Sequence, residues 1–419
     1  MCGISGMLGR RDDPAAESFV ARAVALQRPR GPDHQAAERS DLGGWTAVLG
    51  HNRLAVIDLE PTGHQPMWSS DRRLVTSYNG EIYNYRELRV ELEAAGDRFH
   101  SRSDTEVLLA AWARWGAEAL LRCNGMFAIA MLDLARGELI LARDRFGVKP
   151  LYYAPQPGQL RFASTLGPLL GPGMEPDLEY LRQGLAQGVF EDQTGRTPYR
   201  GILSLPAGHL VRVPLQAERV RPELRQWYDF GAAAATEVDR LARLSLPGAV
   251  AEVRDTLSSA VSLRLRADVP VGVSVSGGLD SATVAVLAAE ERSSVRGVTF
   301  GHPGAPESEA GLVGELAAGR GIVPDYVWPA AERMSELFWS CLRAQQAPFA
   351  SGSVVAQFAV FERARQLGLT VMLGGQGGDE ALGIPDFGAG PHVAGQDHAV
   401  DPAREVAIDA EASGTAAGD

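Results

Sequence analysis

The stretch VGVSVSGGLDS, residues 271–281, decides the fold of the second half of the chain. Alternating valines over Val271–Val275 predict a strand, and Ser276-Gly277-Gly278 predicts a tight loop before a helix over Ser281–Glu290. The backbone N–H groups of such a loop, together with the helix N-terminus, favour a bound anion. The loop lacks the Gly-Lys-Ser/Thr ending of the Walker A pattern. The stretch therefore predicts a phosphate-binding loop of a different kind.

Helices and strands alternate on both sides of this loop. A helix over Ala251–Arg264 precedes it. The elements predicted after it are strands at Gly297–Phe300, Asp325–Trp328 and Leu369–Leu373, with helices at Glu307–Gly319, Glu332–Gln345 and Val354–Gln366 between them. This alternation predicts a parallel sheet. A second glycine-rich loop, LGGQGGDE at residues 373–380, follows the last strand, at the edge where open α/β sheets bind ligands.

The first 165 residues show many short strands and few helices. Strands are predicted over Thr46–Val56, Arg73–Tyr78, Met126–Leu134 and Glu138–Ala142, and the last two form a hairpin. Residues 103–106, SDTE, have capping-box spacing before the apolar run Val107–Trp115. The pattern predicts stacked, mainly antiparallel sheets with helices outside. Residues 166–250 are less regular, with a strand at Leu210–Val213 and a helix at Phe230–Leu246.

The composition excludes several classes of protein. The net charge of −12 argues against a nucleic-acid surface, and no apolar run reaches the roughly 18–20 residues of a membrane span. No basic region precedes an apolar core at the N-terminus, and the three cysteines have no metal-ligand spacing, so a cytoplasmic location is expected. Lys149 is the only lysine among the 40 basic residues.

Cys2 is a candidate nucleophile. The initiator methionine is removed when the next side chain is small, and the new N-terminus would carry a thiol and a free α-amine on one residue. An amine with a pKa of about 8 can act as general base to that thiol. Nucleophilic attack on an amide also needs an oxyanion hole, which the Asn79 side chain and the Gly80 N–H could supply from a turn after a strand.

A free amino acid substrate needs two further partners. Arg53 suits an α-carboxylate through bidentate pairing, and Asp104 suits an α-ammonium. Each residue taken singly also fits a structural role, as an Asn-Gly turn, a surface arginine or a helix-capping aspartate.

Together with Cys2, these residues resemble the class II glutamine amidotransferases, which are N-terminal-nucleophile glutaminases. The matching segments are MCGISG, RGPD, HNRLAVIDL, YNGEIYNY, SDTE and ARDRFGVKPLYY, over most of residues 2–153. The resemblance implies Cys2 as nucleophile, with Asn79 and Gly80 as oxyanion hole. It implies glutamine contacts from Arg53, Glu81 and Asp104 and from the backbone at Val56 and Ile57. The reaction would split glutamine into glutamate and ammonia through a γ-glutamyl thioester.

The loop at 275–281 resembles the PP-loop of ATP pyrophosphatases, which cleave ATP to AMP and pyrophosphate. The resemblance implies ATP contacts from Val275, Ser276, Gly277, Gly278, Asp280 and Ser281, with Phe300 beside the adenine. The loop at 373–380 resembles the second nucleotide loop of the same enzymes and adds Gly374, in place of the usual serine, and Gly375. Asp280 and Asp379 are the implied Mg²⁺ ligands.

The order of the two halves resembles the glutamine-hydrolysing asparagine synthetases. The expected fold is an α+β N-terminal-nucleophile hydrolase domain followed by an α/β parallel-sheet PP-loop domain. The expected extents are 2–215 (glutaminase), 216–250 (linker), 251–383 (partial synthetase domain) and 384–419 (disordered or aberrant tail). The resemblance implies that ammonia passes through a tunnel to β-aspartyl-AMP made from aspartate and ATP, and that the enzyme forms a homodimer.

The chain departs from this family after residue 383. The family continues there as a helical region that carries a lysine near the adenylate, whereas residues 384–419 contain no lysine and no helical pattern. We therefore expect a truncated synthetase domain. Two alternatives remain open: an amide synthase or cyclase of a natural-product pathway that acts on another carboxylate, and a chain that retains only glutaminase activity or a non-catalytic binding role. An N-terminal-nucleophile hydrolase of another amide is disfavoured, because Arg53 and Asp104 suit a free α-amino acid.

Overall fold

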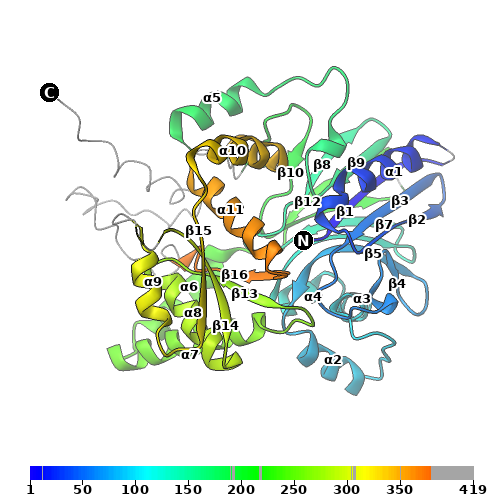
Figure 1. Ribbon diagram of the computed structural model, residues 1–419. Helices are drawn as coiled ribbons and strands as arrows, with labels where there is room; N and C mark the ends of the chain where they lie inside the picture. Colours follow the sequence, from blue (N-terminus) through cyan, green and yellow to red (C-terminus); the bar gives the residue numbers. More distant parts are fainter. Residues whose placement is uncertain are drawn as a thin grey trace. The chain divides into compact units, whose positions relative to one another are not determined.

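The computed structural model describes residues 1–378 except 12, 189, 191–193, 217–218, 303, 305–307 and 350. The chain divides into two compact units (Figure 1). Unit 1 comprises Met1–Tyr180 and Asp192–Thr236, and unit 2 comprises Leu181–Glu191 and Glu237–Asp419. The predicted tail at 384–419 lies outside the described residues. Among the described residues, no helix is both long enough and apolar enough to cross a membrane.

Unit 1 contains two antiparallel six-stranded sheets. The first has the order β10 (Leu203–Ser204), β8 (Tyr152–Gln156), β9 (Gln159–Ala163), β1 (Gly3–Arg10), β3 (Trp45–Arg53) and β2 (His34–Leu42). The second has the order β12 (Glu223–Gln226), β11 (His209–Pro214), β7 (Glu138–Arg143), β6 (Gly125–Asp133), β5 (Leu74–Ile82) and β4 (Met67–Trp68).

The two sheets stack face to face around an apolar layer. The first sheet contributes Ile4, Leu8 and Leu49 to this layer, and the second contributes Val75 and Ala130 among others. Helices cover the outer faces: α1 (Ala15–Gln27) packs on β1 and β3, while α2 (Tyr85–Ala94), α3 (Asp104–Trp115) and α4 (Ala119–Arg122) lie over the second sheet (Figure 1). The predicted stacked antiparallel sheets with outer helices are confirmed.

Unit 2 contains a parallel four-stranded sheet, which confirms the predicted α/β class. The strand order is β15 (Ile322–Val327), β14 (Val295–Phe300), β13 (Val271–Ser274) and β16 (Val371–Leu373). On one face lie α7 (Leu246–Arg264), α8 (Leu279–Arg292) and α9 (Ala310–Ala317). A separate set of apolar contacts joins the sheet to α10 (Ala331–Gln345) and α11 (Ser353–Gln366).

The remaining elements are short or connect the units. Helices α5 (Leu178–Gln187) and α6 (Phe230–Leu241) run across the unit boundary. Single 3₁₀ turns occur at η1 (Arg28–Arg30), η2 (Pro61–Gly63), η3 (Gly116–Glu118) and η4 (Gly167–Leu169).

Two local predictions are wrong. Asn79 and Gly80 do not form a turn; they lie inside β5, where they pair with Ala128 and Phe127. Long-range pairing with β6 therefore overrides the turn preference of an Asn-Gly pair. The predicted helix Phe230–Leu246 is also wrong as a single element, because α6 ends at Leu241 and α7 begins at Leu246, with Ser245 as its N-cap.

The capping box at residues 103–106 is only half formed. Ser103 accepts a hydrogen bond from the Thr105 N–H and caps α3, an interaction typically worth about 1 kcal/mol. The Glu106 carboxylate accepts instead from the N–H groups of His100 and Ser101. Glu106 therefore binds the backbone that precedes α3 and does not bind the Ser103 N–H. This contact fixes the segment that leads to Asp104.

Candidate functional site

Cys2 lies one residue before β1 at the open end of the first sheet. Gly3 pairs with Asn52, so Cys2 lies beside the end of β3. Its Sγ accepts a hydrogen bond from the Leu54 N–H at 3.4 Å, and Arg30 Nε donates to its carbonyl oxygen at 3.0 Å. The nucleophile predicted from the sequence is therefore held through both its side chain and its backbone.

The electrostatic environment of Cys2 favours a neutral thiol next to a weakened amine. Burial raises the pKa of the Cys2 thiol, and the nearby N-terminal amine partly opposes this rise. Burial likewise lowers the pKa of the Met1 amine from 8.0 to about 6. A thiol that stays protonated near neutral pH needs a base to become a nucleophile. The amine in this structure is that of Met1, and removal of Met1 would put the free amine on Cys2 itself.

Asn79 faces the space between the two sheets. The Ser77 hydroxyl donates to the Gly50 carbonyl of β3 at 2.9 Å, and His51 Nε2 lies 3.1 Å from the Tyr78 carbonyl oxygen. Asn79 is two residues beyond Ser77, so its side chain points to the same face. In β3, Asn52 is the strand partner of Gly3, which directly follows Cys2.

The Asn79 side chain is 1% exposed, and neither its Nδ2 nor its Oδ1 has a hydrogen-bond partner. A buried amide without a partner costs about 1–3 kcal/mol, which a folded protein normally avoids. The cost is explained if the amide binds a ligand oxygen in the working enzyme.

The Gly80 N–H points to the open side of β5. Backbone groups alternate along an antiparallel strand, and the neighbouring N–H groups on this side bind side chains. Tyr78 donates to Gln65 Oε1 at 2.7 Å, and Ile82 donates to Asp104 Oδ2 at 3.0 Å. A Cβ at Gly80 would collide with the carbonyl oxygen of Met126, so only glycine fits this pairing with β6.

Arg53 organises the segment that follows β3. Its guanidinium donates to the carbonyl oxygens of Glu60 at 3.0 Å and Ile57 at 3.3 Å, and also to that of Asp58. Ile57 is buried and Val56 half-buried in the same segment. Arg53, the predicted carboxylate-binding residue, therefore holds the backbone at Ile57, one of the two predicted backbone contacts.

Asp104 is anchored to β5 at the first turn of α3. Its Oδ2 accepts from the Tyr78 hydroxyl at 2.8 Å and from the Ile82 N–H, while burial raises the pKa of its carboxyl group. Asp104 and Glu81 both interact electrostatically with the Cys2 region, Asp104 with the thiol and Glu81 with the N-terminal amine. The structure thus brings the unit 1 candidates together around one strand end.

His51 gives this region a pH dependence of stability. It is buried, its Nδ1 has no partner, and burial lowers its pKa from 6.5 to about 3. The unfolded chain therefore takes up a proton below pH 6.5 that the folded chain does not. We expect His51 to reduce the free energy of unfolding by up to about 1.4 kcal/mol for each pH unit between 6.5 and 3.

Urea unfolding of the wild type and of His51→Asn at pH values on both sides of 6.5 measures this contribution, because asparagine keeps a donor for the Tyr78 carbonyl but does not titrate. The wild type should lose more stability than the variant as the pH falls. Parallel losses in the two proteins would contradict the assignment.

In unit 2, the loop after β13 forms a nest of hydrogen bonds. The Ser276 N–H donates to Ser281 Oγ at 3.0 Å, and the two serine Oγ atoms lie 2.8 Å apart. The Gly278 N–H donates to Ser276 Oγ at 3.2 Å, and α8 begins at the next residue without a side-chain cap. These contacts fix the loop at the N-terminus of a helix, a position that favours anions, and they occupy the N–H groups of Ser276 and Gly278.

The second glycine-rich loop packs on the first. The chain order of the strands reverses at β13, whose neighbours are β14 and β16, and ligands bind at such switch points. A Cβ at Gly375 would collide with the backbone at Ser281, and one at Gly378 with the Asp280 carboxylate. Gly374 lies at the exposed start of this loop, so both predicted nucleotide loops meet at one edge of the sheet.

Phe300 and Val275 lie at the same edge. Val275 is buried and donates to the Val298 carbonyl at 3.0 Å, and Phe300 ends β14 with its ring 5.4 Å from that of Trp328. Glu309, which the sequence did not single out, accepts a hydrogen bond from the Gly277 N–H at 2.9 Å. A carboxylate oxygen thus lies where the loop would hold a phosphate oxygen.

The described residues could bind a metal ion only together with the phosphate oxygens of a nucleotide. No three His, Cys, Asp or Glu side chains among them gather closely enough to hold an ion, and Asp379 lies outside them. Mg²⁺ in ATP sites takes one or two carboxylates together with phosphate oxygens and water, and Asp280 is the one predicted ligand among the described residues.

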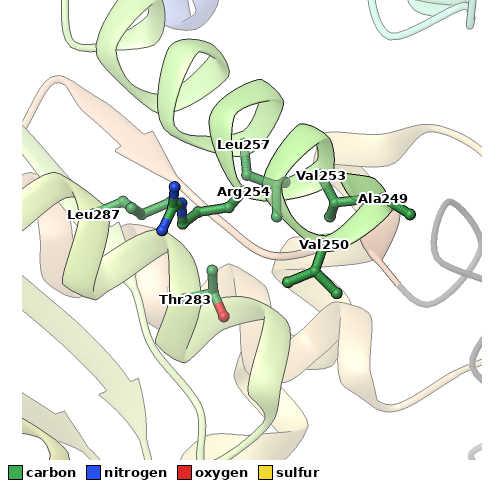
Figure 2. Close-up of a pocket in the computed structure, with 7 residues that line it drawn as sticks. All are labelled: Ala249, Val250, Val253, Arg254, Leu257, Thr283 and Leu287. Carbon is green, nitrogen blue, oxygen red and sulfur yellow. The ribbon is translucent and has the colours of Figure 1, made fainter. Parts of the chain in front are cut away.

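A cavity of about 380 Å³ lies between α7 and α8 (Figure 2). Ala249, Val250, Val253, Arg254 and Leu257 line it from α7, and Thr283 and Leu287 from α8. The lining is almost entirely apolar and includes none of the predicted nucleotide contacts.

Sequence reasoning assigned no role to Arg30, Gln65 or Lys149 at the Cys2 site. Arg30 lies in the quoted segment RGPD and Lys149 in ARDRFGVKPLYY, so the signal for both was present. Gln65 carried no local signal, because its contact with the Tyr78 N–H joins residues 13 positions apart.

Comparison with protein families agrees with the two units. Residues 1–228 match the glutamine amidotransferase domain, and residues 252–406 match the asparagine synthase domain. These matches cover nearly the whole chain.

Several curated proteins are similar to the chain. A Mycobacterium tuberculosis relative is 34% identical over 411 residues, which are 91% of this chain and 60% of the relative. Asparagine synthetase (glutamine-hydrolyzing) 1 of Bacillus subtilis is 33% identical over 91% of this chain and 58% of its own length. Amidase chyE of Penicillium rubens is 29% identical over the same shares of the two chains. The chain thus spans about 60% of the length of such relatives.

Among solved structures, glutamine phosphoribosylpyrophosphate amidotransferase from B. subtilis aligns with a TM-score of 0.41 and 16% identity, over 80% of this chain and 70% of that one.

Proposed function

The chain belongs to the glutamine-hydrolysing asparagine synthetase family, and from this premise we propose that it hydrolyses glutamine at Cys2 and transfers the ammonia to an ATP-activated carboxylate. Residues 2–215 would act as the glutaminase, 216–250 as the linker and 251–383 as the ATP-dependent part. The observation that carries the proposal is the unpaired, buried side-chain amide of Asn79 in β5.

The glutaminase steps follow from the contacts at Cys2. After removal of Met1, the α-amine of Cys2 takes the proton from Sγ, and the thiolate attacks the amide carbon of glutamine. The Asn79 Nδ2–H and the Gly80 N–H stabilise the oxyanion, since both donors are already fixed by β5. The amine returns its proton to the leaving nitrogen, ammonia departs, and water hydrolyses the γ-glutamyl thioester to glutamate.

Substrate orientation is assigned to three charged groups. Asp104 would pair with the α-ammonium of glutamine, and Arg53 would hold the Val56–Ile57 backbone and the α-carboxylate. Glu81, the residue after Gly80 in β5, would be the third charged contact to glutamine. Two of these groups are anchored by backbone contacts before substrate binds, which lowers the ordering cost of binding.

The ATP-dependent steps are assigned to the two glycine-rich loops. The N–H groups of Ser276–Gly278 would exchange their present partners, Ser281 Oγ, the Glu309 carboxylate and Ser276 Oγ, for the pyrophosphate of ATP at the N-terminus of α8. Gly374 and Gly375 would lie on the facing loop, and the adenine between Val275 and Phe300. Mg²⁺ bound to Asp280 and Asp379 would neutralise phosphate charge. Ammonia would then displace AMP from the acyl-adenylate.

Aspartate is the acceptor that we propose first, which makes the product asparagine. The similarity to amidase chyE favours a second candidate, an enzyme of the same mechanism that acts on another carboxylate. Glutamate release from glutamine, and AMP and pyrophosphate release from ATP with each candidate acid, test both. Aspartate-dependent AMP release supports the first candidate, and AMP release with another acid alone supports the second. A chain that releases no glutamate overturns the glutaminase assignment.

Glu309 provides a test of the phosphate loop. Its carboxylate binds the Gly277 N–H that we assign to ATP, so nucleotide must displace a negative charge from this position. We expect Glu309→Gln to bind ATP about fivefold more tightly, equivalent to about 1 kcal/mol, in calorimetric titrations with Mg²⁺ present. Glu315→Gln, which removes an exposed charge from the same helix, should leave the affinity unchanged. Weaker ATP binding by Glu309→Gln would instead mean that the carboxylate assists the nucleotide.

The cytoplasmic location and the homodimer remain predictions from the sequence.

A further inference from the structure

Gln65 lies where the backbone pairing of β4 with β5 ends. Met67, the first residue of β4, pairs with Thr76. The same register would place Gln65 opposite Tyr78, and there the Gln65 side chain takes over from the backbone: its Oε1 accepts the Tyr78 N–H at 2.7 Å. A backbone N–H can only donate, so this contact fixes the orientation of the amide. The Gln65 Nε2 then donates to Thr105 Oγ1 at 3.2 Å, which joins β5 to α3.

The contacts of Gln65 belong to a closed set that includes Asp104. The Tyr78 hydroxyl donates to Asp104 Oδ2 at 2.8 Å, and Asp104 directly precedes Thr105 in the first turn of α3. Gln65 therefore binds the backbone of Tyr78, while Asp104 binds its hydroxyl. All four side chains are buried. Strand β5 cannot move away from α3 without breaking buried hydrogen bonds, which is costly.

This set of contacts lies on both sides of the proposed oxyanion donor. The N–H groups of an antiparallel strand alternate in direction, so those of Tyr78, Gly80 and Ile82 point to the same edge of β5. Gln65 accepts the first of them, and Asp104 Oδ2 accepts the third at 3.0 Å. The Gly80 N–H lies between two bound neighbours, and its position is thus set by side chains from two other parts of the chain.

We propose that Gln65 is a positioning residue of the glutaminase, whose side-chain amide fixes the distance between the Gly80 N–H and the Asp104 carboxylate. These two groups are assigned to opposite ends of glutamine, to the oxyanion and to the α-ammonium, so the distance between them has to match the substrate. Gln65 acts through Tyr78 and Thr105 and is assigned no contact with glutamine or with the thiol. The inference rests on the proposed glutaminase function.

The test is glutamate release by Gln65→Met, which keeps an unbranched side chain and removes both hydrogen bonds. We expect kcat to fall about 30-fold, which is part of the roughly 10²–10³-fold that one oxyanion donor contributes. Gln65→Glu should restore most of the rate, because a carboxyl group in either protonation state offers an oxygen to the Tyr78 N–H. Thr105→Val keeps that contact and removes only the acceptor for Nε2, so kcat should fall about fivefold.

Thr76→Val is the matched control on the same strand. The buried Thr76 hydroxyl donates to the Ala130 carbonyl at 3.1 Å, a contact between β5 and β6. Its loss should lower the thermal midpoint and leave kcat unchanged. A Gln65→Met variant that loses stability in the same way but keeps kcat, or a Gln65→Glu variant that does not restore the rate, overturns the proposal. If Gln65→Met fails to fold, an unchanged kcat in Thr105→Val overturns it.

Hydrogen exchange of the backbone amides in residues 77–83 gives a readout that does not depend on turnover. Exchange of the Tyr78 N–H should be about tenfold faster in Gln65→Met than in the wild type, and unchanged in Thr76→Val. Equal exchange in Gln65→Met and the wild type contradicts the proposed role. A wild type that releases no glutamate overturns the glutaminase assignment, whereas an active wild type with an equally active Gln65→Met variant overturns this proposal alone.

Discussion

Cys2→Ala is expected to abolish glutamate release from glutamine, with kcat lowered by about 10⁴-fold or more. The thiol is the nucleophile in the proposed reaction, and the Leu54 N–H already holds its Sγ in place. No alanine side chain can form the thioester. A coupled assay of glutamate formation measures the effect, and the thermal midpoint of the variant should stay close to that of the wild type because Cys2 lies outside the apolar layers.

Cys123→Ala is the matched control. Cys123 is also a free thiol, but it is buried in the apolar layer under α3, and burial raises its pKa to about 12. This variant should lose stability and retain kcat. Intact mass measurement adds a second check, because an active chain must begin at Cys2. Full activity in Cys2→Ala, or in a chain that retains Met1, would contradict the assignment of the nucleophile and its base.

The local patterns of the sequence predicted the elements that depend on neighbouring residues. The strand, loop and helix at residues 271–292 follow from alternating valines and two glycines, and the structure differs from the prediction by only a few residues at the ends. The helix at 104–115 follows from Ser103 and an apolar run in the same way. Each signal lies within one element, so no information from distant parts of the chain was needed.

The geometry of the sites depends on distant parts of the chain and could not be predicted in the same way. An Asn-Gly pair is typical of a turn, yet Asn79 and Gly80 continue a strand because β6, more than 40 residues later, supplies their partners. The Gln65 contact to Tyr78 and the Glu309 contact to Gly277 likewise join separate elements. Residue identities could therefore be assigned from motifs, whereas the contacts that fix their orientation required the structure.

Asn79→Ala is expected to lower kcat for glutamine hydrolysis by about 10²–10³-fold with a smaller change in KM, which is the usual cost of removing one oxyanion donor. The amide is buried without a partner in the structure, so its removal deletes no existing hydrogen bond. Stability should therefore stay the same or rise, while the rate falls. Alkylation of Cys2 should proceed at the wild-type rate, because Asn79 acts on the oxygen of the substrate and not on the thiol.

Asn52→Ala separates this effect from that of simply losing a buried asparagine. Asn52 Nδ2 donates to the Val24 carbonyl at 2.9 Å and so ties β3 to α1. Its loss should lower the free energy of unfolding by about 1–3 kcal/mol and leave kcat within a few-fold of the wild type. Asn79→Ala is thus expected to lower kcat without lowering stability, and Asn52→Ala to lower stability with little change in kcat. A lower stability of Asn79→Ala with unchanged kcat would mean that the amide supports the fold, and the oxyanion site would then have to be sought elsewhere on β5.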